Sequence, residues 1–176
     1  KKIINRPETV VTEMCKGLVL TNPDLEFVKK YKVIRKKILI RISQPDNGGG
    51  SGHEPAHAGF VGKGMLDAAV CGDVFASPSQ IQVYQAIKET AGDKGTLLII
   101  KNYSGDMMNS KIAAHLAEED GIQVDYVKVD DDIAVRTAFI LLADEALRVQ
   151  FWYIKVAGAA AEKAVLERGK AAAEMQ

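Results

Sequence analysis

The sequence predicts an α/β fold in which a mostly parallel, open β-sheet carries helices on both faces. Two strand-like runs lead to this prediction, TLLIIK at 96–101 and VDYVKV at 124–129. The unbroken apolar run of the first is typical of a strand that helices cover on both sides. An amphipathic segment at 107–120 separates the two runs, and the order strand, helix, strand favours parallel pairing through a right-handed crossover.

The first part of the chain predicts a helix, a strand and a long loop. Residues 7–20 predict the helix, because Pro7 suits a first helical position and apolar side chains recur at helical spacing. ILIRIS at 38–43 predicts the strand, and QPDNGGGSG at 44–52 is expected to form the loop behind it. The basic cluster at 29–37 is interpreted as a solvent-exposed surface.

The later elements are read in the same way. Residues 66–76 predict a short buried strand, and a helix is expected to open at Ser77-Pro78-Ser79 and to run through about Thr90. We expect a further helix from Ala157 onward. The segment before it, QFWYIKV at 150–156, has strand-like composition, and a short apolar run cannot be assigned by pattern alone.

Length and charge narrow the function classes. A chain of 176 residues favours a single α/β domain spanning 1–176. Basic and acidic residues balance at 23 each, so nothing suggests a nucleic acid or an anionic membrane as partner. No apolar run is long enough to span a bilayer, and Cys15 and Cys71 form no CxxC motif. We therefore expect a soluble, cytoplasmic protein with reduced thiols.

Three loops follow predicted strands at their carboxyl ends, where ligands bind in open parallel sheets. These loops are 48–53, 102–106 and 130–132. If the strands are neighbours in the sheet, the loops converge on one site.

The first loop combines glycines with a histidine, since its residues are Gly48, Gly49, Gly50, Ser51, Gly52 and His53. Glycines let the backbone approach a ligand, and His53 can accept or donate a proton near neutral pH. The alternative is a flexible linker, since Gly/Ser segments are often spacers. It is not a phosphate-binding P-loop, because no GK[ST] follows the glycines.

The second loop is bounded by Lys101 and Asp106. Lys101 could neutralise an anionic group, and Asp106 could accept a proton from a hydroxyl. Asp106 could instead only cap the helix that follows. The acidic run 130–132 could bind a divalent cation, but solvation or helix capping is the stronger interpretation, so no metal site is expected. His57 and His115 are interpreted as supporting or packed side chains.

Three segments together closely resemble the dihydroxyacetone-binding subunit of dihydroxyacetone kinases. They are GGGSGHEPAHAGFVGKGMLDAAVCGDVFASPS, GTLLIIKNYSGDMMN and VDDDIAV, and a fainter resemblance covers residues 1–37 and AGAAAE at 157–162. A combination of this length is far more specific than one glycine motif. The resemblance implies phosphoryl transfer to a hydroxyl of a short-chain ketose such as dihydroxyacetone, within glycerol and triose metabolism.

The resemblance also assigns residues. Gly50, Ser51, Gly52 and His53 match the substrate loop of the family. Lys101 matches a lysine that contacts the substrate. Asp106 matches the acid/base aspartate that takes the proton from the attacking hydroxyl, with His53 assisting.

Partners follow from the same resemblance. It implies a homodimer with no cofactor bound by this chain. The phosphoryl donor, ADP or ATP with Mg, is implied on a separate nucleotide-binding subunit or domain. In phosphotransferase-linked bacterial systems the bound ADP is re-phosphorylated, whereas ATP serves elsewhere.

The chain departs from the family pattern in three respects. The family holds its ketose covalently through a histidine in a second half of the chain, and that half, together with the family's second domain, is absent from this sequence. QPDN at 44–47 stands where a strand usually runs directly into GGGSGH, and 136–156 keeps the family's spacing but not its residues. Two alternatives to catalysis therefore stay open: a ketose-sensing regulatory protein and an inactive fragment.

Overall fold

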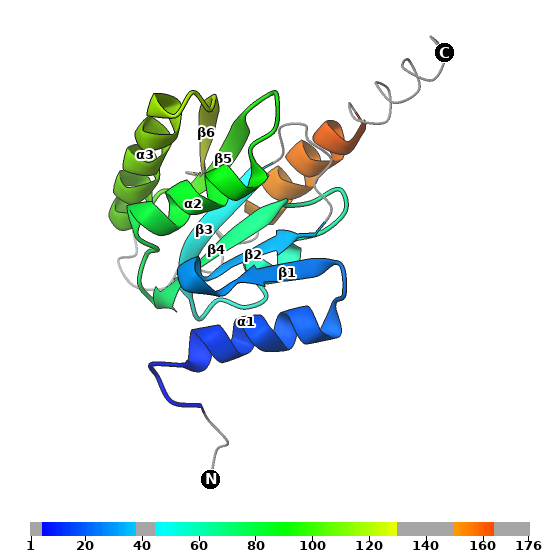
Figure 1. The fold of residues 1–176 in the computed structure, drawn as a ribbon, viewed down its shortest axis with the longest axis vertical. Coiled ribbons are helices and arrows are strands. Elements are labelled where there is room, and N and C mark those ends of the chain that lie inside the picture. Colours follow the sequence, from blue (N-terminus) through cyan, green and yellow to red (C-terminus); the bar gives the residue numbers. More distant parts are fainter. Residues whose placement is uncertain (1–4, 38–44, 130–149, 164–176) are drawn as a thin grey trace, which may run out of the picture.

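A computed structural model describes residues 5–37, 45–129 and 150–163 (Figure 1). The described residues form a six-stranded sheet in the order β1-β2-β4-β3-β5-β6. The strands are β1 (Leu25–Val28), β2 (Val33–Lys36), β3 (Pro45–Ser51), β4 (Ala68–Val74), β5 (Thr96–Lys101) and β6 (Val124–Val129). The helices are α1 (Val10–Thr21), α2 (Gln80–Thr90) and α3 (Ser104–Glu119), and residues 150–163 are also helical.

The α/β class is confirmed, but the sheet is mixed. β3 pairs in parallel with β4 and with β5, and β5 pairs in parallel with β6. β1 and β2 form an antiparallel hairpin, and β2 pairs antiparallel with β4. The prediction of a mostly parallel sheet is therefore not confirmed, because an antiparallel hairpin that the sequence interpretation missed extends one side of the sheet.

The second strand of the hairpin, β2, lies within the basic cluster at 29–37. Within β2, Val33 and Ile34 are fully buried, whereas Arg35 and Lys36 turn toward carboxylates. The Arg35 side chain is 18% exposed and lies 2.8 Å from the carboxylate of Glu26 on β1. Lys36 pairs with Asp67, whose side chain is 3% exposed. The interpretation of this cluster as a solvent-exposed surface is thus wrong for Arg35 and Lys36, whereas Lys37 is exposed.

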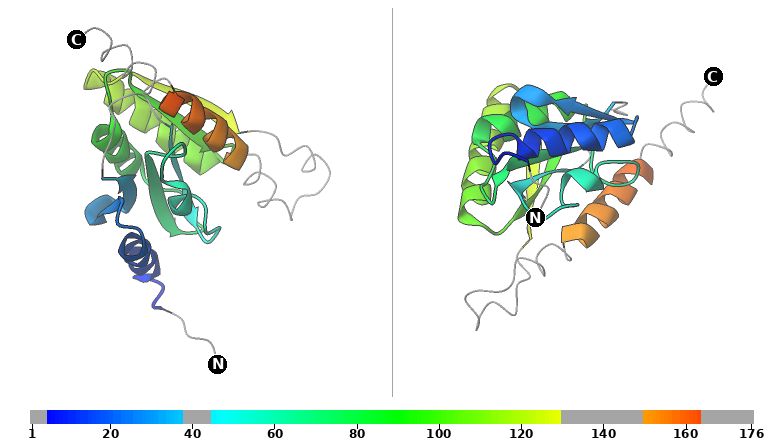
Figure 2. Two further views of the ribbon diagram at one scale, coloured as in Figure 1. Left: turned by 90° about the vertical axis from the view of Figure 1, so that its right-hand side faces the viewer. Right: turned by 90° about the horizontal axis from the view of Figure 1, so that it is seen from below.

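Successive residues of a strand point to opposite faces of the sheet, and both faces carry buried residues that helices cover. On β4, Ala68 and Val70 pack in a core with α2 and α3. The intervening residues Ala69 and Cys71 pack in a second core with α1 and with Ile154 of the 150–163 helix. Figure 2 shows the ribbons of α1 (blue) and of the 150–163 helix (orange) from two further sides. No helix in the described ranges has the length and apolar composition needed to cross a bilayer.

Several predicted elements match the structure closely. The strands at 96–101 and 124–129 have the expected bounds, and β4 lies within the predicted 66–76. α2 begins after Ser79, which forms a capping box with Gln82: each residue's side chain receives a hydrogen bond from the other's backbone N–H.

Other elements differ. The predicted strand at 38–43 lies outside the described residues. The predicted loop at 44–52 is wrong, because Pro45–Ser51 forms β3, held between β4 and β5. Pairing on both sides of this strand supplies backbone hydrogen bonds that outweigh the weak strand preference of glycine. Residues 150–156 are helical despite their strand-like composition.

Candidate functional site

A cavity of about 430 Å³ opens at the carboxyl ends of the central strands. The residues that line it are Gly50, His53, Phe75, Ser77, Lys101, Tyr103 and Asp106. They lie at the carboxyl ends of β3, β4 and β5 or in the segments that follow these strands, which are neighbours in the sheet. The structure therefore brings together the predicted loops at 48–53 and 102–106. The acidic loop at 130–132 lies outside the described residues.

A buried ion pair forms one wall of the cavity. Lys101 ends β5 and Asp106 lies in the first turn of α3, with Lys101 Nζ 3.8 Å from Asp106 Oδ2. Both side chains are 4% exposed. Burial lowers the pKa of Lys101, and the negative charge of Asp106 opposes that shift.

Asp106 keeps one oxygen available. Its Oδ1 is buried and receives no hydrogen bond from any described residue. The interpretation of Asp106 as only a helix cap is not supported, because Tyr103 occupies the N-cap position of α3. A buried carboxylate oxygen beside a cavity is placed to accept a hydrogen bond from a ligand hydroxyl.

The glycines of β3 permit close packing rather than flexibility. A Cβ atom at Gly49 would lie 2.6 Å from Lys101 Nζ and 3.0 Å from His57 Nε2. A Cβ atom at Gly50 would lie 2.8 Å from the backbone nitrogen of Ala76. Only glycine lets the strand pass so close to these groups. The linker alternative for this segment is therefore wrong.

The rest of the first loop divides into two roles. His53 lines the cavity, and its ring meets the Phe75 ring nearly edge-on, with centroids 5.3 Å apart. Ser51 is buried, and its hydroxyl donates a hydrogen bond of 2.8 Å to the carbonyl of Gly72. Gly52 has a φ of +122°, and its N–H donates to the carboxylate of Glu54. Ser51 and Gly52 shape the loop but do not line the cavity.

His57 lies behind the cavity wall. It is 5% exposed, and burial, together with Lys101 and His53, lowers the pKa of His57 to about 3. The imidazole is therefore neutral at physiological pH. A neutral ring beside Lys101 adds no like charge to the buried ion pair.

Phe75, Ser77 and Tyr103 were not predicted as site residues. Both Phe75 and Ser77 follow β4, which ends at Val74. The carboxyl-end rule applied to the predicted strand at 66–76 points to Ser77, whereas Phe75 falls inside that predicted strand. Tyr103 follows β5, and its ring lies 5.4 Å from Lys101 Nζ. Among the described residues, no group of three or more His, Cys, Asp or Glu side chains is arranged to hold a metal ion.

Comparisons with known proteins bear on this geometry. The Dak1 domain matches residues 16–175. The chain is 45% identical over 181 residues to the dihydroxyacetone-binding subunit of the PTS-dependent dihydroxyacetone kinase 1 of Listeria innocua, covering 99% of this chain and 54% of that subunit. The chain thus spans about half the length of that relative.

Solved structures show the same likeness. The dihydroxyacetone kinase from C. freundii, in complex with AMP-PNP and Mg²⁺, has a TM-score of 0.81 at 36% identity, over 99% of this chain and 34% of that one. A dihydroxyacetone kinase operon co-activator has a TM-score of 0.79 at 35% identity, over 86% of this chain and 47% of that one.

Proposed function

The chain belongs to the Dak1 domain family, and from that premise we propose that it forms the acceptor side of a dihydroxyacetone kinase. It binds a short-chain ketose such as dihydroxyacetone and positions one hydroxyl for phosphoryl transfer. The observation that carries this proposal is the buried Lys101–Asp106 pair, which faces a cavity whose other walls carry Gly50 and His53.

The chemistry of the lining residues suits a small polyol. The backbone of Gly50 can approach the ligand closely because no side chain intervenes. Lys101 donates hydrogen bonds to a carbonyl or hydroxyl oxygen, and Asp106 Oδ1 accepts one. Ser51 and Gly52 contribute by fixing the path of the loop that carries His53.

In the proposed reaction, a ketose hydroxyl oxygen attacks the terminal phosphorus of the donor. The new O–P bond forms as the bond between that phosphorus and the leaving nucleotide breaks. The hydroxyl proton passes to Asp106, with His53 assisting. Positioning and electrostatics supply most of the catalysis in phosphoryl transfer, so a rigid, largely buried acceptor site suits this reaction.

We place the phosphoryl donor on a separate subunit or domain. The C. freundii kinase was solved with AMP-PNP and Mg²⁺, and its chain is about three times as long as the region that matches here. ADP or ATP with Mg would accordingly reach the mouth of the cavity from a nucleotide-binding partner. From the family resemblance we also propose a homodimer, and from the two free, buried cysteines a cytoplasmic location.

A second candidate is a ketose sensor without catalysis. The likeness to the operon co-activator favours it specifically, because its TM-score and identity nearly equal those of the kinase. In that case the cavity binds the ketose and a regulatory partner responds to the bound state.

One experiment separates these functions. The protein is titrated with dihydroxyacetone by calorimetry, then assayed for phosphorylated triose with a nucleotide-binding kinase subunit, nucleotide and Mg²⁺. Binding with product formation supports the kinase. Binding without product supports the sensor, and absence of binding contradicts both.

A further inference from the structure

Phe75 has two unfavourable properties at the mouth of the cavity. Its side chain is 71% exposed, and its backbone φ of +51° lies in a region that bulky L-residues rarely adopt. Such a conformation persists only where the surrounding structure enforces it, and it occurs preferentially at functional sites. The contacts of Phe75 show what enforces it.

The first loop holds Phe75 from one side. The Phe75 N–H donates a hydrogen bond of 2.7 Å to the carbonyl of Ser51. The Phe75 ring lies over Gly52, where a Cβ atom would approach it to 2.8 Å. The ring then meets His53 nearly edge-on, with 80° between the two ring planes. Edge-to-face contacts of this kind favour one relative orientation of the rings.

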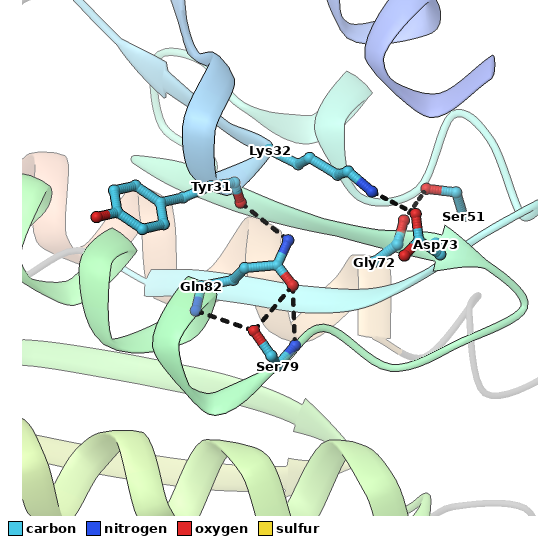
Figure 3. A network of polar contacts seen from close by, with 7 residues as sticks. All are labelled: Tyr31, Lys32, Ser51, Gly72, Asp73, Ser79 and Gln82. Carbon is cyan, nitrogen blue, oxygen red and sulfur yellow. Dashed lines mark hydrogen bonds and ion pairs between the residues drawn. The ribbon is translucent and has the colours of Figure 1, made fainter. Parts of the chain in front are cut away.

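The turn that carries Phe75 is anchored before and after it. Asp73 forms an ion pair with Lys32, and its carbonyl accepts a hydrogen bond from the Ala76 N–H. Ser51 donates to the carbonyl of Gly72 (Figure 3). These contacts attach the start of the turn to the β1–β2 connection and to the end of β3.

The far end of the turn is attached to the same connection. Ser79 and Gln82 form the capping box of α2, and Gln82 Nε2 donates a hydrogen bond of 3.1 Å to the carbonyl of Tyr31 (Figure 3). Tyr31 and Lys32 are adjacent in sequence, so one short connection supports both ends of the segment 72–79. The antiparallel hairpin thereby supports a wall of the site.

We propose that Phe75 is a positioning residue that orients the His53 imidazole in the cavity. Its role in turnover rests on the kinase function proposed above. Phe75 acts through His53: its ring blocks the other positions that the imidazole could take. The anchored turn keeps the Phe75 ring in place without a ligand.

The test measures the chemical reactivity of the His53 imidazole. Diethyl pyrocarbonate modifies accessible imidazoles, and the chain contains three histidines that peptide mass spectrometry can separate. His115 is 73% exposed and serves as the internal reference, whereas buried His57 reports unfolding. Phe75→Leu should raise the modification rate of His53 about fivefold relative to His115. Phe75→Tyr, which keeps the ring, should match the parent protein.

Turnover supplies a second measurement. With the nucleotide-binding kinase subunit, Phe75→Leu should lower kcat about tenfold, change KM less than threefold, and be rescued by Phe75→Tyr. Val74→Ala is the matched control, because Val74 is half-exposed, adjacent to Phe75 and not part of the cavity lining. If the parent protein shows no turnover, the kinase proposal fails, but the His53 rates still decide the role of Phe75.

A folding defect does not block the test. If Phe75→Leu also makes His57 reactive, the Lys32→Met variant is used in place of Phe75→Leu. Lys32→Met removes the ion pair with Asp73 and leaves every cavity residue intact. His53 should then react about twofold faster than in the parent, with His57 protected. Unchanged His53 rates in every folded variant would overturn the proposal, as would equal rates in Phe75→Leu and Phe75→Tyr.

Discussion

Within the described residues, the candidate site can be compared with a second cavity of nearly equal size. The candidate site measures about 430 Å³, and a second cavity between α1 and the loop after His53 measures about 440 Å³. The residues that line the second cavity are Met14, Gly17, Leu18, Thr21, Glu54, Pro55, Ala58 and Gly59. The candidate site contains a buried ion pair, whereas the second cavity has a lining that is mostly apolar. Volume therefore does not distinguish the two cavities, whereas the buried charge beside the candidate site does.

The two cavities also use glycine differently. Gly49 lies behind the candidate site, and a Cβ atom there would collide with Lys101 and His57. Gly17 lies in α1, and a Cβ atom there would meet nothing within 4 Å. One glycine is required by close packing and the other is not.

The largest effect is expected for Asp106→Asn. An amide cannot take the hydroxyl proton, so turnover should fall about 10³-fold, whereas ketose binding should change less than tenfold. Turnover assays and calorimetry measure the two quantities. Asp120→Asn, beyond the exposed end of the same helix, is the control and should leave both unchanged. Equal losses of binding and turnover in Asp106→Asn would instead indicate a structural role.

Replacement of glycine by alanine is expected to change the free energy of unfolding in opposite directions at Gly49 and Gly17. Gly49→Ala should lower the free energy of unfolding by about 1–3 kcal/mol through overpacking and weaken ketose binding at least tenfold. Gly17→Ala should raise the free energy of unfolding by up to about 1 kcal/mol, because alanine is the better helix former. Urea unfolding and calorimetry measure these effects. Similar stability changes in both variants would refute the close-packing explanation.

The neutral state of His57 predicts a pH dependence of stability. The pKa of His57 is about 3 in the folded protein, against an ordinary value of 6.5. Between these values the unfolded chain binds more protons, so the free energy of unfolding decreases as the pH falls. His57 should account for a loss of about 2 kcal/mol between about pH 7 and about pH 5.

Urea unfolding across this pH range measures the slope. The slope should be smaller in His57→Gln than in the parent protein. His115→Gln removes an exposed histidine and should keep the parent slope. If His57→Gln also keeps it, His57 is not the group that titrates.

The smallest effect is expected for Glu54→Gln, at the border between the two cavities. Glu54 lines the second cavity and accepts a hydrogen bond from the Gly52 N–H. The amide oxygen of glutamine can still accept that bond, so ketose binding should change less than threefold. Calorimetry with Glu54→Gln tests this. A change of tenfold or more would mean that the second cavity communicates with the site.

The elements that the sequence predicted correctly are those with a strong signal in their own residues. The strand-like runs at 96–101 and 124–129 and the cap at Ser79 are local signals, and all three match the structure. The carboxyl-end rule brought Lys101 and Asp106 to the same place as His53 because parallel strands end at the same edge of a sheet.

What the sequence did not predict depends on contacts between distant residues. The glycines of β3 suggested a loop, because nothing local indicates that two strands flank them. The hairpin was not predicted because the basic residues of β2 suggested an exposed surface. Arg35 and Lys36 are neutralised by Glu26, which lies on another strand, and by Asp67, which is distant in the chain. Phe75 was missed because its role depends on the contact with His53.

The helix of residues 150–163 has a consequence for protein synthesis. Gly158 packs against the carbonyls of Gly64 and Met65, Glu162 accepts a hydrogen bond from the Gly64 N–H, and Ile154 completes the core beneath α1. Gly64 and Glu162 are 98 residues apart, which a ribosome translates in about 5–20 s. During that interval the α1 side of the nascent sheet lacks the helix of residues 150–163. We expect this interval to be when the newly made chain depends most on chaperones.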